Sequence, residues 1–195
     1  MRIAIIFLLI TLLGCAQEPQ DKEVVNLLDL PGLMDELAVN MGAENHRITK
    51  SFILNSKVET KQYESSDSSF WRQELNKLHE IDLNSPQIRG GISVRRKIKD
   101  NNSNLLIDEY SIPDTKFTTL KILRIYYMAD TSEIRQIYAE LSSDNLIATS
   151  NTYINIWMNR YNNRLLIDSL QTKGKDKTLM QPAREYMITT HTIWE

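Results

Sequence analysis

Few residues in this chain are suited to chemistry, and their spacing decides what they can do. The sequence has one cysteine, Cys15, and three histidines, at His46, His79 and His191. The histidines are far apart and show neither a His-x-x-x-His nor a His-Glu-x-x-His spacing. A zinc site needs ligands that converge, so no metal site is predicted. There is also no Gly-x-Ser-x-Gly motif, so we expect no catalytic residue, no cofactor and no enzymatic activity.

Residues 1–14 have the parts of an export signal. Arg2 supplies a basic start, Ile3–Leu13 is an uncharged apolar run, and Gly14 is a small residue directly before Cys15. The run is shorter than the roughly 20 residues that span a bilayer. It fits the apolar region of a secretory signal, which has about 7–15 residues. We therefore predict a signal peptide over residues 1–14; the alternative is a buried N-terminal strand or helix.

The run Leu12-Leu13-Gly14-Cys15 resembles the lipobox of bacterial lipoproteins: an apolar residue, a small residue, then the cysteine. In that class the chain is cut between Gly14 and Cys15, the cysteine sulfur carries a diacylglycerol, and the new amino group is acylated. Leu13 is bulkier than the pattern prefers. The resemblance implies that the membrane is a partner through Cys15. Ala16, where an aspartate would signal inner-membrane retention, implies the outer membrane.

A basic run, Arg95-Arg96-Lys97-Ile98-Lys99, is the second candidate site. Regular strand alternation places Arg95, Lys97 and Lys99 on one side, where they could meet the head groups of phospholipid or lipopolysaccharide. The alternative is neutralisation by the next strand, with Arg95 opposite Glu109 and Arg96 opposite Asp108. Such cross-strand pairs contribute roughly 0.2–1 kcal/mol each.

Aromatic side chains give a third candidate, an apolar ligand face that includes Tyr127, Trp157 and Trp194. Six of the eight tyrosines and two of the three tryptophans come after residue 125. Aromatic residues are common in strands, but residues 122–128 and 153–158 have apolar side chains on both faces. Helices must cover one such face. The other meets a second layer, the sheet's own curled continuation, or a ligand such as an acyl chain.

The elements that must position these residues can be read from periodicity and turn residues. Helices are predicted over 31–41, which begins at Pro31 and ends at Gly42, and over 69–81, which ends before Pro86. A hairpin is predicted over 48–54 and 57–63. Further strands are predicted over 92–99, 105–112, 117–128, 133–141, 146–158, 164–171 and 185–194. Short turns between successive strands favour antiparallel pairing. The fold class is therefore α+β, with early helices packed on a large, curved antiparallel β-sheet that forms a meander.

Composition limits the partners and the means of stabilisation. The formal net charge is −2, and loss of residues 1–14, whose one charged residue is Arg2, makes it −3. Nucleic-acid binders carry a basic surplus, so no nucleic-acid partner is expected. With its sole cysteine lipidated, the chain has no disulfide, and packing must stabilise it. Residues 15–23 are predicted to be the lipidated cysteine and a polar tether, and residues 24–195 a single domain.

Two further resemblances concern the domain. A Trp71-x-x-Glu74-Leu75 helix followed by Asp82-x-Asn84-x-Pro86 is similar to a segment of a family of outer-membrane lipoproteins with no assigned activity. It implies a lipid-anchored envelope protein and no catalytic residues. In architecture alone, the predicted fold resembles periplasmic lipoprotein carriers, whose curved sheet and helices enclose an acyl-chain cavity.

These observations predict a lipid-anchored protein of the cell envelope, located at the outer membrane, with a non-enzymatic binding or structural role. Its partner is expected to be an envelope protein or a lipid. The alternative is a carrier or chaperone that binds an acyl-chain ligand in the curved sheet. A third hypothesis is a hydrolase whose site is assembled from dispersed Asp, Glu, Ser and His residues.

Overall fold

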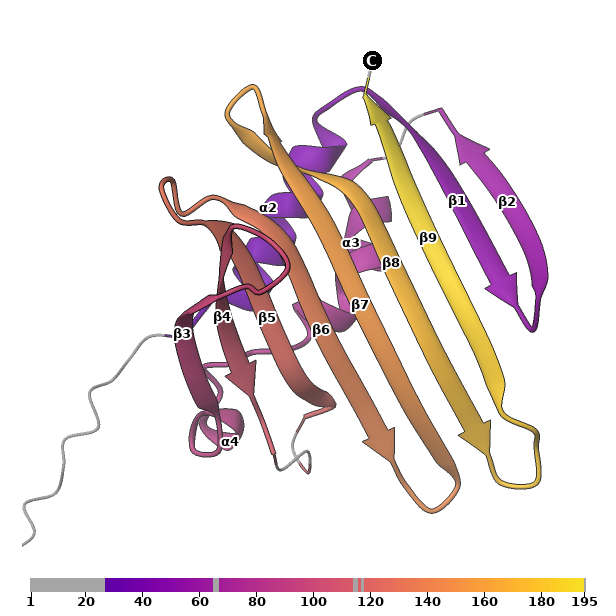
Figure 1. Cartoon of the computed structure of the whole chain (residues 1–195). Coiled ribbons are helices and arrows are strands. Elements are labelled where there is room, and N and C mark those ends of the chain that lie inside the picture. The colour runs from indigo at the N-terminus through magenta and orange to yellow at the C-terminus, as the bar shows by residue number, and fades with distance from the viewer. Residues whose placement is uncertain (1–26, 65–66, 114–115, 117, 195) are drawn as a thin grey trace, which may run out of the picture.

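Nine antiparallel strands form one open sheet in the computed structural model, with helices on one of its faces (Figure 1). The structure describes residues 27–64, 67–113, 116 and 118–194. The helices are α2 (Leu30–Gly42), α3 (Ser68–His79) and α4 (Pro86–Arg89). The strands are β1 (His46–Leu54), β2 (Lys57–Tyr63), β3 (Ser93–Lys99), β4 (Leu105–Ser111), β5 (Leu120–Met128), β6 (Ile134–Asp144), β7 (Ala148–Tyr161), β8 (Arg164–Thr178) and β9 (Arg184–Trp194). The α+β fold class predicted from the sequence is confirmed.

The strand order is β2-β1-β9-β8-β7-β6-β5-β4-β3. From β3 to β9 each strand pairs with the next one along the chain, which is the predicted meander. The N-terminal hairpin then joins the far end of this meander, because β1 pairs with β9 from His46 opposite Trp194 to Leu54 opposite Tyr186. The two ends of the domain are therefore held together by backbone hydrogen bonds near the β2 edge of the sheet.

Local sequence signals begin both long helices. The Asp29 side chain accepts a hydrogen bond from the Gly32 N–H at 3.0 Å at the start of α2, and Asp67 accepts one from the Phe70 N–H at 2.9 Å at the start of α3. Side-chain oxygens in this position satisfy N–H groups that the helix itself leaves unpaired. Pro31 is in the first turn of α2, where its missing N–H has no cost.

The core lies between the two long helices and one face of the sheet. Its helix side comes from buried residues at helical spacing, such as Met34, Leu37 and Met41 in α2 and Trp71, Leu75 and Leu78 in α3. The sheet side comes from alternate residues: in β6, Ile137, Ala139 and Leu141 are buried. Fully burying one large apolar side chain contributes about 1.5–3 kcal/mol. Among the residues that the structure describes, no helix covers the opposite face of the sheet, which faces the viewer in Figure 1; we call it the helix-free face.

One glycine allows the two long helices to meet. A Cβ at Gly42 would lie 2.5 Å from the backbone nitrogen of Ser68, which is closer than atoms can pack. The end of α2 therefore contacts the start of α3, and only a residue without a side chain fits there.

Two elements differ from the sequence-based expectation. Residues 86–89, which lie between the predicted helix over 69–81 and the predicted strand over 92–99, form the short helix α4; Pro86 ends one helix but suits the first turn of the next. The sequence predicts a strand that ends at residue 171, but β8 continues through Lys173–Lys177 to Thr178. Pairing with β7 on one side and β9 on the other satisfies its backbone groups.

The predicted signal peptide, the cleavage site at Gly14 and Cys15, and the predicted tether lie outside the described residues. Among the residues that the structure does describe, no helix is long and apolar enough to cross a membrane.

Candidate functional site

A groove lies beneath α3 on the helix side of the sheet. Its lining comes from β1, α3, β7, β8 and β9, and its volume is about 180 Å³. The lining residues are Lys50, Gln73, Glu74, Lys77, Ile154, Leu170, Thr172, Tyr186, Ile188 and Thr190. We call this hollow the α3 groove. Because β1 and β9 are neighbours in the sheet, residues from both ends of the chain contribute to it.

The floor of the α3 groove is apolar with hydroxyl groups set into it. Ile154 and Leu170 are 4% and 3% exposed, and Thr190, which pairs with Leu170 across β8 and β9, is 1% exposed. Among the described residues the Thr190 hydroxyl has no hydrogen-bond partner. A buried hydroxyl without a partner costs free energy, so a ligand that supplies an acceptor or donor there would be favoured.

The rim of the groove is charged. Lys50 of β1 and Glu74 of α3 form an ion pair with a nitrogen–oxygen distance of 2.5 Å, and the Lys50 ammonium also lies 5.8 Å from the centre of the Phe70 ring. Lys77 is exposed one helical turn further along α3 and lines the groove as well. These groups give the groove an apolar interior with cations at its edge.

Two further hollows adjoin the α3 groove along the same helix. One, of about 230 Å³, lies over Leu141, Ser150 and Thr152, and the other, of about 270 Å³, lies between α3, α4 and Thr119. Lys77 lines all three. Each hollow is smaller than the roughly 300–1,000 Å³ of typical small-molecule sites, so a ligand of ordinary size would have to extend over more than one of them.

A close contact in the sheet shapes the boundary between two of these hollows. Tyr186 lies directly over Gly174 on the neighbouring strand, where a Cβ would overlap the tyrosine ring. The Tyr186 hydroxyl is 3.3 Å from that of Thr152. The Tyr186 side chain therefore lines the α3 groove, and its hydroxyl contacts Thr152, which lines the adjacent hollow.

An aromatic cluster surrounds His46, at the start of β1. The His46 ring centre is 6.0 Å from that of Trp71 and 5.2 Å from that of Trp194. The His46 Nδ1 lies 2.8 Å from the Glu44 carbonyl oxygen, and the Trp71 indole N–H donates to Nε2 at 3.4 Å. Burial lowers the pKa of His46, although the hydrogen bond to Glu44 opposes this. The neutral ring, with Nδ1 as donor and Nε2 as acceptor, satisfies both contacts.

The predicted apolar face does not form as one surface. Trp157 alternates with the buried Ile156 and Met158 and therefore lies on the helix-free side, where it is 36% exposed. Trp194 contacts His46 and Tyr161, and its indole N–H donates to Asp168 at 3.1 Å. Tyr127 follows a β-bulge, and its hydroxyl donates to Asp108 at 3.0 Å. Sequence alternation could not show that these residues belong to three separate environments.

The predicted row of Arg95, Lys97 and Lys99 is also interrupted. A β-bulge lies between Arg95, which is opposite Glu109, and Ile98, which is opposite Ile107. Lys97 has φ of 57° and its N–H donates to Asp108 at 2.9 Å. The extra residue shifts the alternation, so Arg95 and Lys99 fall on opposite sides of the strand. The register confirms the pairing of Arg95 with Glu109, but it does not pair Arg96 with Asp108. Head-group binding by these side chains stays a prediction.

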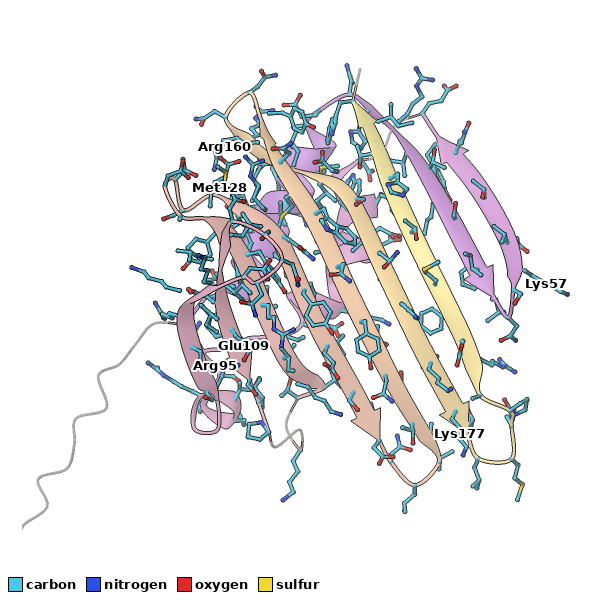
Figure 2. All side chains as sticks on the ribbon, viewed as in Figure 1. Lys57, Arg95, Glu109, Met128, Arg160 and Lys177 are labelled. Atoms are coloured by element: carbon cyan, nitrogen blue, oxygen red, sulfur yellow. The ribbon has the colours of Figure 1, made fainter. Side chains whose placement is uncertain are left out.

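Glu109 is the charged centre of the helix-free face near its β3 edge, and Figure 2 shows it beside Arg95. It is 7% exposed and forms ion pairs with Arg95 and with Arg124, the latter at 2.7 Å. Burial would raise the pKa of the Glu109 carboxyl, but the two guanidinium groups outweigh it and hold the pKa below its ordinary value. The Arg124 guanidinium also lies 5.5 Å from the centre of the Tyr138 ring. Arg95, Glu109 and Arg124 therefore form a satisfied ion-pair network at this edge of the face.

The sequence analysis missed the α3 groove because its lining residues are spread from position 50 to position 190. The described residues contain no group of three or more His, Cys, Asp and Glu side chains that could hold a metal ion. Comparison of the chain with models of protein families, with curated proteins and with solved structures gives no match. Function must therefore be inferred from the residues of this chain alone.

Proposed function

We propose that this chain is a lipid-anchored, non-enzymatic protein of the cell envelope, at the outer membrane, that binds an amphipathic acyl-chain ligand beneath α3. The observation that carries the ligand is the α3 groove, where the Thr190 hydroxyl lacks a partner among the described residues within an apolar floor. The lipobox at Cys15 supports the location.

The chemistry of the groove favours such a ligand in two ways. Ile154, Leu170 and Ile188 offer apolar surface to a hydrocarbon chain, and removing such surface from water contributes about 25 cal/mol per Å². Lys77 at the rim offers a cation to an anionic head group. Three adjoining hollows along one helix would also accommodate an elongated ligand.

The test is whether lipid stays with the purified protein and whether filling the groove removes it. Native mass spectrometry and organic extraction of the full-length protein are expected to show a co-purifying lipid. In a titration with a fluorescent fatty acid, Thr172→Phe should weaken binding at least about tenfold, which corresponds to about 1.4 kcal/mol, because the new ring occupies the groove that Thr172 lines.

The matched control is Gln171→Phe, one residue earlier on the same strand. Gln171 pairs with Asn155 and Thr189, which lie on the helix-free face, so this variant adds the same ring on the opposite side of the sheet. It should bind as the wild type does. Equal weakening by both variants, or a wild-type protein that carries no lipid and does not bind the probe, would contradict the proposed ligand.

A second candidate, binding of a partner protein, is favoured by the helix-free face. Tyr153 and Trp157 are 37% and 36% exposed there, and aromatic residues are enriched among those that dominate binding energy in protein interfaces. A protein that purifies without lipid would direct the search for a partner to this face.

A further inference from the structure

Two turns at the same end of the sheet expose large apolar side chains. Leu146 and Ile147 of the β6–β7 turn are 98% and 66% exposed, and Leu179 and Met180 of the β8–β9 turn are 64% and 97% exposed. The turns lie side by side, because the Leu179 N–H donates to the Ile147 carbonyl oxygen at 2.8 Å. Figure 1 shows both turns at the lower ends of the strands, beyond the helices. We call these four residues the apolar tip.

The local structure holds these side chains outward. The Asn145 side chain accepts hydrogen bonds from the N–H groups of Ile147 and Ala148, each at 2.9 Å, and this fixes the turn around Leu146. In the β8–β9 turn, Met180 has φ of 63°, a conformation that glycine or asparagine adopts more readily. Folding of the domain explains neither the choice of methionine at that backbone angle nor the exposure of four apolar side chains.

Basic residues flank the β8–β9 turn, at the adjoining ends of β8 and β9. Lys177, labelled in Figure 2 at this end of β8, is exposed, and Arg184 is exposed at the start of β9. Three acidic residues also lie near this end: Asp144 accepts a hydrogen bond from Thr149 at 2.9 Å, Asp176 accepts one from Ser150 at 2.6 Å, and Glu185 forms an ion pair with Lys175 at 2.8 Å. Apolar side chains in front of long basic ones match the boundary between acyl chains and anionic head groups.

We propose that the apolar tip inserts into the surface of a bilayer that contains anionic lipid. The tip has no aromatic residue, and its four aliphatic side chains project from two turns instead of forming a flat surface, which suits lipid better than a protein partner. Residues 16–26, which include most of the predicted tether, separate Cys15 from Leu27, and a chain of that length reaches at most about 40 Å. The tip and the anchor would then contact the same membrane, independently of any ligand in the α3 groove.

The test uses the full-length lipidated protein in vesicles, with a fluorophore that reports the polarity around it. Cys15 is the sole cysteine, and its sulfur is blocked if it carries lipid, so Leu146→Cys or Met180→Cys provides one free thiol for an NBD label. Labelled tips are expected to shift to shorter emission wavelengths in phosphatidylcholine vesicles that contain phosphatidylglycerol. Spin labels on the acyl chains should quench them.

The control is Asn162→Cys in the β7–β8 turn, which is exposed at the opposite end of β7. Its label should neither shift nor be quenched, and adding Leu146→Asp to Met180→Cys should abolish the shift at position 180. Unshifted labels at both tip positions would overturn the proposal, and equal insertion into phosphatidylcholine alone would overturn its anionic preference. If the NBD reagent labelled the wild-type protein, the Cys15 thiol would be free. That result would contradict the proposed lipid anchor and would not bear on insertion of the tip.

Discussion

At the scale of single residues, burial favours the neutral form of His46. No sequence motif includes His46, yet its side chain is 2% exposed and lies against the rings of Trp71 and Trp194. If His46 gained a second proton, its Nε2 would become a donor facing the Trp71 indole N–H, which is also a donor. The neutral ring is therefore part of the packing between β1, α3 and β9.

This arrangement predicts a pH dependence of stability. The pKa of His46 is lower in the folded protein than its ordinary value of 6.5, so below that pH the unfolded chain binds more protons than the folded one. Stability should then fall as the pH drops from about 7 to 5, with a slope from this group of at most about 1.4 kcal/mol per pH unit. Urea unfolding at several pH values measures the slope.

Two variants isolate the contribution of His46. His46→Gln should reduce the slope over this interval, whereas His191→Gln, at an exposed position of β9, should leave it as in the wild type. If His46→Gln and the wild type lose stability in parallel, another group is responsible.

At the scale of elements, irregularities in the strands decide which side chains share a face. The bulge in β3 separates Arg95 from Lys99 although their spacing is regular. In β8 the lysines of the Lys173–Lys177 segment are exposed, while Gly174 between them is buried under Tyr186. A lysine-rich segment thus becomes the last part of a strand because its glycine accommodates an aromatic ring from the next strand.

The contact between Gly174 and Tyr186 gives a prediction for the stability of the sheet. Gly174→Ala should destabilise the protein by about 1–3 kcal/mol because the new methyl group overlaps the Tyr186 ring. Gly90→Ala, where no atom lies within 4 Å of the new Cβ, should have little effect. Chemical denaturation measures both.

A double mutant tests the cause. If the overlap is responsible, Gly174→Ala should cost much less in a protein that already has Tyr186→Ala. An unchanged cost in that background would show that the effect comes from the backbone instead.

At the scale of the whole molecule, the sheet is larger than the helices that cover it. Figure 1 shows α2 and α3 behind the upper and middle parts of the sheet, with the ends of β6–β9 extending past them. The α3 groove lies between α3 and the sheet, and the adjoining hollow over Leu141 extends to Ser143 and Ser150, near the β6–β7 turn.

The proposed anchor makes a prediction about the complete protein. Cys15→Ser should abolish fatty-acid labelling and leave an uncut precursor, because a serine hydroxyl does not form the thioether. Ala16→Ser, which changes the next residue and keeps the thiol, should be labelled and cut normally. Radiolabelled palmitate with electrophoresis of the envelope fraction measures both, and labelling of Cys15→Ser would exclude the proposed lipidation site.

The sequence by itself determined the α+β class, both long helices and the seven-strand meander, because caps, periodicity and turn residues act between neighbours along the chain. Tertiary structure alone decided that β1 pairs with β9, that β8 runs through Lys173–Lys177, and that Trp157 and Trp194 lie in different environments. Tertiary structure also forms the α3 groove, because it brings Lys50, Lys77 and Thr190 together. The pairing of β1 with β9 joins residues more than a hundred positions apart, and no local pattern encodes which distant strand supplies the partner for each hydrogen bond. The bulge in β3 depends on its register with β4, which regular alternation along β3 does not reveal.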